Sequence, residues 1–291
     1  MCLVVICLVV VPLLCSANIL LRHTLLSRDM YADEHCVDFS QFSSQHQVMQ
    51  FLVNQGYRVQ RSVAELPTLT WNFVDDFETY KRIYLVPGAG ALEFKKFKEE
   101  PNDSWEAFSG LRPRVELVKT KVVLKDTLYR LRYEFSPVGV AQDGAQAFRG
   151  YVLQIFDHGD HGEAFPTLVV EIRGNVLYIQ FKEVKNGRME GAHIAKLADI
   201  EEWGGKQWFN LDVFFVISEN PGHAFVRIYV NGQFAWERRA VNGAGTRSKA
   251  NIQYGLYGPG GIELNTRVRY VCWHHVDGIP DTLFIADARE L

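Results

Sequence analysis

The chain has 291 residues, of which 47% are hydrophobic and 22% are charged, and its formal net charge is −3. This composition excludes collagen-like and low-complexity chains and supplies enough apolar residues for a buried core. Because the 31 Lys and Arg residues do not outnumber the 34 Asp and Glu residues, we expect no nucleic-acid partner.

The first 21 residues contain no Lys, Arg, Asp or Glu and are almost wholly apolar. An apolar run that ends in Cys15-Ser16-Ala17 is typical of a signal peptide. An uncleaved single-pass anchor is the alternative, since about 20 apolar residues span a bilayer. We therefore assign residues 1–17 to a signal peptide or N-terminal anchor, and we expect a secreted domain or, alternatively, a membrane-anchored one. No other membrane partner is expected.

Only two of the five cysteines, Cys36 and Cys272, follow this segment. In an oxidising compartment such a pair commonly forms a disulfide. We expect a Cys36–Cys272 bond that ties an N-terminal arm to the last strands, and two separate buried thiols are the alternative.

Residues 18–68 are expected to form this arm, which contains a short helix. The pair Ser43-Ser44 can cap the start of a helix, and Gly56 can end it. Between them lie apolar residues at helical spacing: Val48, Met49, Phe51 and Leu52.

From about Trp71 the apolar pattern changes to a period of two. Alternating rows begin at Tyr129, Leu177 and Phe209, and Asn231-Gly232 is a strong signal for a hairpin turn. Because these strands follow one another with little helix between them, we predict an all-β fold. Residues 69–291 are expected to form a two-sheet antiparallel jelly-roll sandwich, concanavalin-like in architecture.

Three predicted strands carry polar side chains at alternate positions, which places those side chains on one face of a sheet. Arginine, glutamine and tyrosine on one strand face are typical of a wet groove, and ordinary solvent-facing residues with an Arg114–Glu116 contact are the alternative. The residues are Arg112, Arg114 and Glu116 in the first strand, Gln154 and Phe156 in the second, and Gln253, Gly255 and Tyr257 in the third.

Together these strands resemble the jelly-roll polysaccharide lyases of the alginate lyase, glucuronan lyase and heparin lyase I type. That family carries an R-x-E-L-type strand, a Q-I-H strand and a late Y-F-K-x-G-x-Y strand. The runs here are Arg114-Val115-Glu116-Leu117, Gln154-Ile155-Phe156 and Ile252-Gln253-Tyr254-Gly255-Leu256-Tyr257. The order and approximate spacing agree over about residues 71–273.

The resemblance implies a secreted polysaccharide lyase that cleaves a uronic-acid-containing polysaccharide by β-elimination. Arg114 and Gln154 would neutralise the uronate carboxylate, and Tyr257 would be the acid or base. His158 is a further catalytic candidate, because it follows the position of the family histidine. The expected substrate-binding residues are Arg112, Gln253, Tyr254 and Gln180.

Two departures from the family pattern favour a different function. Phe156 and Gln253 stand where the family has histidine and lysine, and neither can exchange a proton. The alternative is therefore a non-catalytic, lectin-like protein that binds carbohydrate. In both cases the expected partner is an acidic polysaccharide or oligosaccharide, and the expected state is a monomer.

Other chemistries have less support. Glycoside hydrolysis needs two carboxylates at a set separation, and the nearest run, Asp75-Asp76-Phe77-Glu78, has the wrong order. We expect no cofactor. The run Asp157-His158-Gly159-Asp160-His161 leaves a structural divalent cation open, although a polar loop explains the same residues.

Overall fold

The structure is a computed structural model. It describes residues 35–62, 82–96, 114–138, 149–158, 164–185, 188–220, 222–240, 249–258 and 264–276. The expected signal segment 1–17, the run at 75–78 and Arg112 lie outside these ranges, as do the side chains of Arg114 and His158. No helix in the described ranges is long and apolar enough to cross a membrane.

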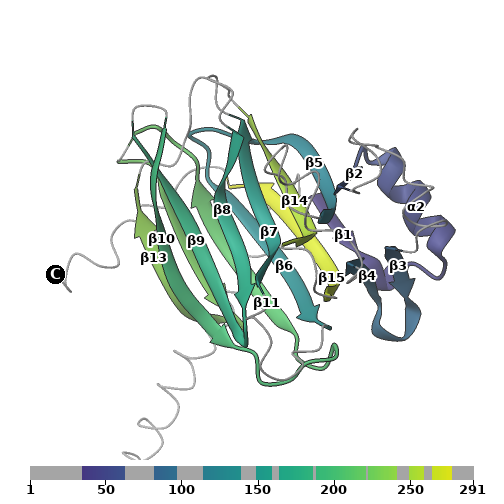
Figure 1. Cartoon of the computed structure of the whole chain (residues 1–291). Coiled ribbons are helices and arrows are strands. Elements are labelled where there is room, and N and C mark those ends of the chain that lie inside the picture. The colour runs from purple at the N-terminus through teal and green to yellow at the C-terminus, as the bar shows by residue number, and fades with distance from the viewer. Residues whose placement is uncertain are drawn as a thin grey trace, which may run out of the picture.

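The described strands form two antiparallel sheets that pack face to face (Figure 1). The eight-stranded sheet has the order β13-β12-β11-β6-β15-β4-β3, and β1 also pairs with β15. Its strands are β1 (His35–Asp38), β3 (Ile83–Val86), β4 (Ala91–Lys96), β6 (Tyr129–Pro137), β11 (Phe209–Val216), β12 (Phe225–Val230), β13 (Gln233–Arg239) and β15 (Leu264–His275).

The seven-stranded sheet has the order β10-β9-β8-β7-β14-β5-β2. The chain crosses between the sheets at β5, β6 and β7, whereas β7 to β10 and β11 to β13 each follow one another within one sheet. The two packed antiparallel sheets confirm the predicted jelly-roll sandwich. The strands of this sheet are β2 (Arg58–Ser62), β5 (Arg114–Leu124), β7 (Arg149–His158), β8 (Ala164–Arg173), β9 (Val176–Lys185), β10 (Arg188–Asp199) and β14 (Lys249–Tyr257).

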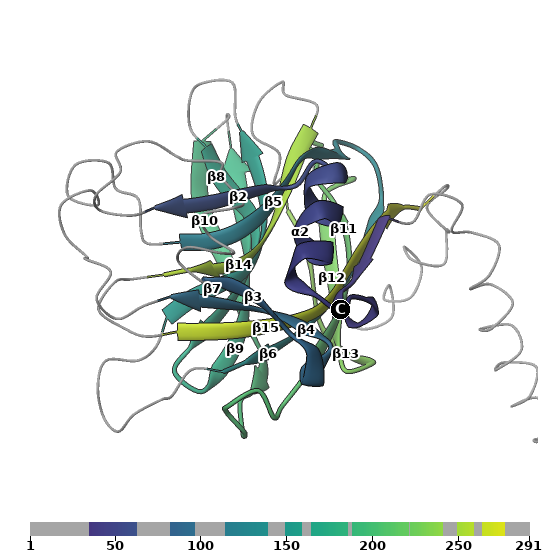
Figure 2. The same cartoon turned by 90° about the vertical axis from the view of Figure 1, so that its right-hand side faces the viewer.

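The predicted short helix is confirmed as α2 (Gln45–Asn54). Ser44 caps it, since the Ser44 hydroxyl accepts a hydrogen bond from the Gln47 amide at 3.3 Å. The helix lies at one side of the sandwich beside β3 (Figures 1 and 2), where the Gln45 side chain donates to the Ile83 carbonyl at 2.8 Å. Two short 3-10 turns, η1 (Phe39–Gln41) and η3 (Pro87–Ala89), complete this region.

The region around α2 also contributes one strand to each sheet, in addition to the predicted helix. β1 pairs with β15 in the eight-stranded sheet, and β2 pairs with β5 at the edge of the seven-stranded sheet. These strands have four and five residues, which is too short for an alternating pattern to stand out.

The core fills the space between the two sheets and is rich in aromatic side chains. Its largest fully buried members include Tyr133, Tyr254, Phe39, Phe94, Phe135, Phe181, Phe209 and Phe215. Apart from Phe39 on η1, these side chains come from strands of both sheets, so burying them holds the sheets together.

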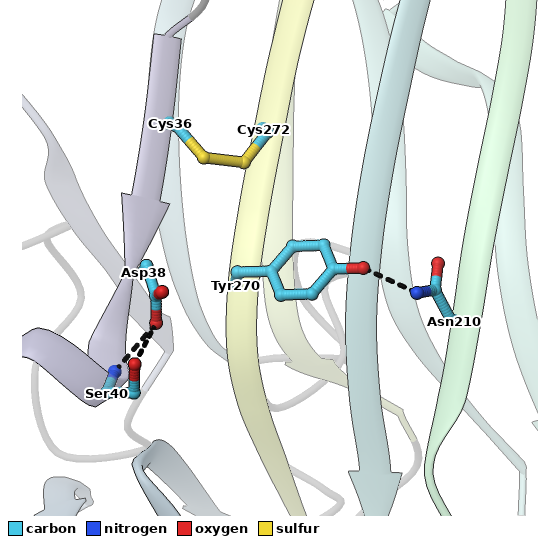
Figure 3. The surroundings of a disulfide bond; sticks show 6 residues. All are labelled: Cys36, Asp38, Ser40, Asn210, Tyr270 and Cys272. Carbon is cyan, nitrogen blue, oxygen red and sulfur yellow. Dashed lines mark hydrogen bonds between the residues drawn. A yellow bond between two sulfur atoms is a disulfide. The ribbon is translucent and has the colours of Figure 1, made fainter. Parts of the chain in front are cut away.

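The predicted disulfide is confirmed. Cys36 on β1 and Cys272 on β15 are register partners, with Cα atoms 4.1 Å apart, and their sulfur atoms are bonded (Figure 3). Beyond the bond, β1 ends at Asp38, whose carboxylate accepts from the Ser40 amide at 2.9 Å. The bond therefore fixes β1, and the turn that leads to α2, against the eight-stranded sheet.

Removing this bond is expected to destabilise the protein. The bond joins residues 236 positions apart, so the Cys36→Ser/Cys272→Ser variant should lose about 2–5 kcal/mol of unfolding free energy. Chemical denaturation measures this loss. Reductant should lower the stability of the wild-type protein and leave the double variant unchanged. Equal stability of the wild-type protein with and without reductant would contradict the account.

The buried tyrosines predict a loss of stability at alkaline pH. Burial raises the pKa of Tyr133 and Tyr254 well above the usual value, and the pKa of Tyr57 also rises. Their contribution to stability is therefore complete below about pH 10 and is lost as the pH rises from there towards the raised pKa values. Tyr254→Phe keeps the packing and should weaken this dependence. The test is the unfolding free energy from about pH 8 to pH 11, and a constant value would contradict it.

Candidate functional site

The side chains of the central strand β14 point either into the core or to the outer face of the seven-stranded sheet. The outer face is the one turned away from the core. Figure 1 shows β14 between β7 and β5. Ile252, Tyr254 and Leu256 belong to the core cluster. Because side chains alternate along a strand, Gln253 and Tyr257 take the outer face.

Two of the predicted catalytic residues are register partners on adjacent strands. Tyr257 is the direct partner of Arg114 on β5 and of Tyr151 on β7. The rings of Tyr257 and Tyr151 lie 5.3 Å apart, centroid to centroid, and both side chains are half-buried. The register therefore aligns Arg114, Tyr257 and Tyr151 in one row across three adjacent strands.

Gln154 also lies on the outer face, but its amide group has a partner within the protein. Gln154 is the register partner of Gln253, and its side chain is 1% exposed. Its Nε2 donates to Oε1 of Glu116 at 2.6 Å, and Glu116 is fully buried on β5. In this arrangement Gln154 stabilises a buried carboxylate by a charge-assisted hydrogen bond.

Gln253 and Gln180, both expected to bind substrate, are buried as well. The Oε1 atom of Gln253 has no hydrogen-bond partner among the residues that the structure describes. Gln180 donates to Oε2 of Glu171, which also forms an ion pair with Arg173 at 2.7 Å. Gln180 thus takes part in a second buried carboxylate network, two strands away from β7.

The two buried carboxylates are too widely spaced for glycoside hydrolysis. Glu116 on β5 and Glu171 on β8 are three strands apart, which is about 14 Å at the backbone. A hydrolase needs its two carboxyl groups roughly 5–10 Å apart. Each of these two carboxylates also accepts a glutamine amide, as expected for structural groups.

The expectation that Tyr254 binds substrate is wrong. Tyr254 is fully buried, and its ring lies 6.1 Å from Tyr57, 6.1 Å from Phe94 and 6.2 Å from Tyr133. The reason is strand alternation, since Tyr254 is an odd number of residues away from both Gln253 and Tyr257 and therefore faces the core.

The expectation that His158 assists Tyr257 is also wrong. Tyr257 pairs with Tyr151, whereas Phe156 pairs with Asn251 near the opposite end of β14. The His158 backbone is seven residues beyond Tyr151, which is about 20 Å along the strand. The register therefore places the His158 backbone far along the sheet from the row of Tyr257.

Tyr151 was missed because a β-bulge changes the alternation. In β7, Tyr151 pairs with Glu171 and Leu153 pairs with the adjacent Val170, so Val152 is an extra residue. Without the bulge, the odd spacing of Tyr151 and Gln154 would put them on opposite faces. The sequence holds no clear signal for such a bulge.

Strand β14 is irregular at the same place, and Gly255 makes this possible. The pairing with β7 shifts between Tyr254 and Tyr257, and Gly255 has φ of +135°. A Cβ atom there would lie 2.9 Å from a ring carbon of Phe94 and closer still to the Val115 carbonyl oxygen. Glycine is therefore required for the conformation that presents Tyr257.

Replacing Gly255 is expected to disturb both stability and the site. Gly255→Ala should cost at least about 2 kcal/mol, because it combines backbone strain with a clash. The matched control is Gly191→Ala on β10, where a Cβ atom would meet nothing within 4 Å, and its effect should be below about 1 kcal/mol. Thermal and chemical unfolding measure both. Equal effects of the two substitutions would contradict the role of Gly255.

No group of three or more His, Cys, Asp or Glu residues in the described part of the chain could hold a metal ion. The side chains of the 157–161 run, which left a cation open, lie outside that part.

Comparison with known proteins supports the fold. No protein-family model matches the chain, and no curated protein matches its sequence. The structure is similar to alginate lyase A1-II', a member of polysaccharide lyase family 7, with a TM-score of 0.55 and 14% identity over 76% of this chain and 95% of that one. It is also similar to alginate lyase AlyC3, with a TM-score of 0.57 and 15% identity over 82% and 96% of the two chains.

A third structure, AlyC3 in complex with dimannuronate, gives a TM-score of 0.56 and 15% identity, and the match covers 83% of this chain and 96% of that one. At these identities the likeness concerns the fold alone. The resemblance inferred from the three strand motifs is therefore confirmed at the level of architecture, in which this chain shares the jelly-roll sandwich of alginate lyases.

Proposed function

We propose that the protein is a polysaccharide lyase that cleaves a uronic-acid-containing polysaccharide by β-elimination on the outer face of the seven-stranded sheet. The observation that carries this proposal is the register pairing of Arg114 with Tyr257, beside Tyr151 and at the irregular part of β14. The shared architecture with alginate lyases supports the same reading.

The chemistry needs a cation and a group that exchanges protons. The C5 proton of a uronate is weakly acidic because the neighbouring carboxylate is charged. The Arg114 guanidinium would neutralise that carboxylate by hydrogen bonds assisted by charge. The Tyr257 hydroxyl would serve in proton transfer to or from the sugar.

Gln154 takes a different part in this proposal from the one expected from the sequence. Its amide donates to Glu116 and is almost fully buried, so carboxylate neutralisation would rest on Arg114. Gln154 would instead hold the Glu116 carboxylate in place, two residues along β5 from Arg114 in the row that contains Tyr257.

We also propose the domain division and location that the sequence predicts. Residues 1–17 would be a signal peptide or anchor, 18–68 an arm and 69–291 the lyase-like domain, acting outside the cell as a monomer. The Cys36–Cys272 bond supports this location, because disulfides persist in oxidising compartments.

The second candidate function is carbohydrate binding without cleavage. It is favoured by one observation, the burial of Gln154 against Glu116, which removes an expected neutralising group from the surface. In that case the aromatic pair Tyr151 and Tyr257 would stack on sugar rings without exchanging protons.

An ultraviolet assay separates these functions. Incubation with alginate, glucuronan and glycosaminoglycans should produce the absorbance of an unsaturated uronate with at least one polymer. Tyr257→Phe should lower the rate by about 100-fold or more, since it removes the proton-transfer group. The matched control is Tyr178→Phe on β9, where the ring packs against Arg173 about three strands from Tyr257. It should leave the rate unchanged.

Two results would count against the lyase proposal. Binding of a polymer without any absorbance change would favour the second candidate. Full activity of Tyr257→Phe would remove Tyr257 from the mechanism.

A further inference from the structure

The proposed reaction needs two proton transfers, and Tyr257 alone supplies only one group that exchanges protons. A base must remove the C5 proton, and an acid must protonate the departing O4 atom. The His158 backbone lies about 20 Å along the strand from the row of Tyr257. Phe156, at the position of the family histidine, pairs with Asn251 and lies far from that row as well.

Tyr151 is a proton-exchanging side chain that contacts Tyr257. The two residues are register partners on adjacent strands, and their ring centroids lie 5.3 Å apart at an interplanar angle of 57°. Both are half-buried, and neither belongs to the core cluster. Two phenol groups therefore lie side by side on the outer face of the sheet.

Both strands depart from regular pairing to make this contact. β7 holds the extra residue Val152 between Tyr151 and Leu153, and β14 holds Gly255, which has a positive φ, two residues before Tyr257. Such bulges are common beside active sites, where they redirect a side chain. Irregularity in two neighbouring strands at one point indicates that the position of the tyrosine pair matters.

We infer that Tyr151 is a second catalytic residue and that the pair divides the two proton transfers. This inference rests on the proposed lyase function. One tyrosine, as phenolate, takes the C5 proton, and the electrons of the C5–H bond form the C4=C5 double bond. The C4–O4 bond breaks, and the other phenol gives its proton to O4. A proton passing between the two tyrosines then restores the starting state.

The geometry also selects the stereochemistry of the substrate. Two hydroxyl groups from one face of one sheet approach the sugar from a single side. They can act together only where the C5 hydrogen and O4 lie on the same face of the sugar ring. D-mannuronate and D-glucuronate have this arrangement, whereas their C5 epimers, L-guluronate and L-iduronate, do not. We therefore expect cleavage of polymannuronate or glucuronan in preference to polyguluronate.

The test compares the full chain with Tyr151→Phe, Tyr257→Phe and the double variant on polymannuronate and polyguluronate. Each single substitution should lower kcat by about 100-fold or more, with KM changed less than about 3-fold. The kcat of the double variant should lie within about 3-fold of the kcat of the slower single variant, because the pair acts as a unit. Tyr178→Phe is the matched control and should match the wild-type protein.

A second substitution separates catalysis from structure. Tyr151→His can still exchange a proton, so it should retain at least about 10 times the rate of Tyr151→Phe. Both variants should melt at the wild-type temperature. Activity of Tyr151→Phe within about 3-fold of wild type, while Tyr257→Phe is inactive, would overturn the inference and leave the proposed function standing.

Faster cleavage of polyguluronate than of polymannuronate would overturn the inference that both tyrosine hydroxyl groups approach the sugar from a single side. A wild-type protein that cleaves none of the polymers, including glucuronan, would contradict the proposed function itself and with it the catalytic role of Tyr151.

Discussion

The packing of Tyr254 between the two sheets fixes the orientation of the central strand on which the site depends. Its ring meets Tyr57, Phe94 and Tyr133 in the core and has no exposed surface. A shift of β14 by one residue would expose this side chain and bury Gln253 in the core. The energy of the core therefore determines which residues of β14 reach the outer face.

Irregular pairing in β7 and β14 then determines which side chains form the candidate site. The bulge at Val152 and the positive φ of Gly255 bring Tyr151 and Tyr257 together, which strict alternation would not do. Two buried carboxylate networks, Glu116 with Gln154 and Glu171 with Gln180 and Arg173, hold the same face of the sheet. The hydrogen bonds of these carboxylates favour a rigid surface around the tyrosine pair.

Sequence patterns predicted the parts of the molecule that follow regular geometry. The alternating rows, the capped helix and the two cysteines led to the sandwich, α2 and the disulfide. The motifs singled out Arg114 and Tyr257, which the register of the structure pairs. Strand register was not predictable, because it depends on contacts between distant segments, so His158 was placed too near Tyr257. Bulges have no clear sequence signal, which is why Tyr151 was missed.

The central claim is that a uronate polymer binds over the tyrosine pair on the outer face of the seven-stranded sheet. The most direct measurement is a crystal structure of the Tyr257→Phe variant with a mannuronate oligosaccharide, since this variant should turn over substrate at least about 100-fold more slowly. The account predicts a uronate ring whose C5 or O4 atom lies within about 3.5 Å of the Tyr151 hydroxyl. An oligosaccharide bound to the eight-stranded sheet, or away from β7 and β14, would contradict it.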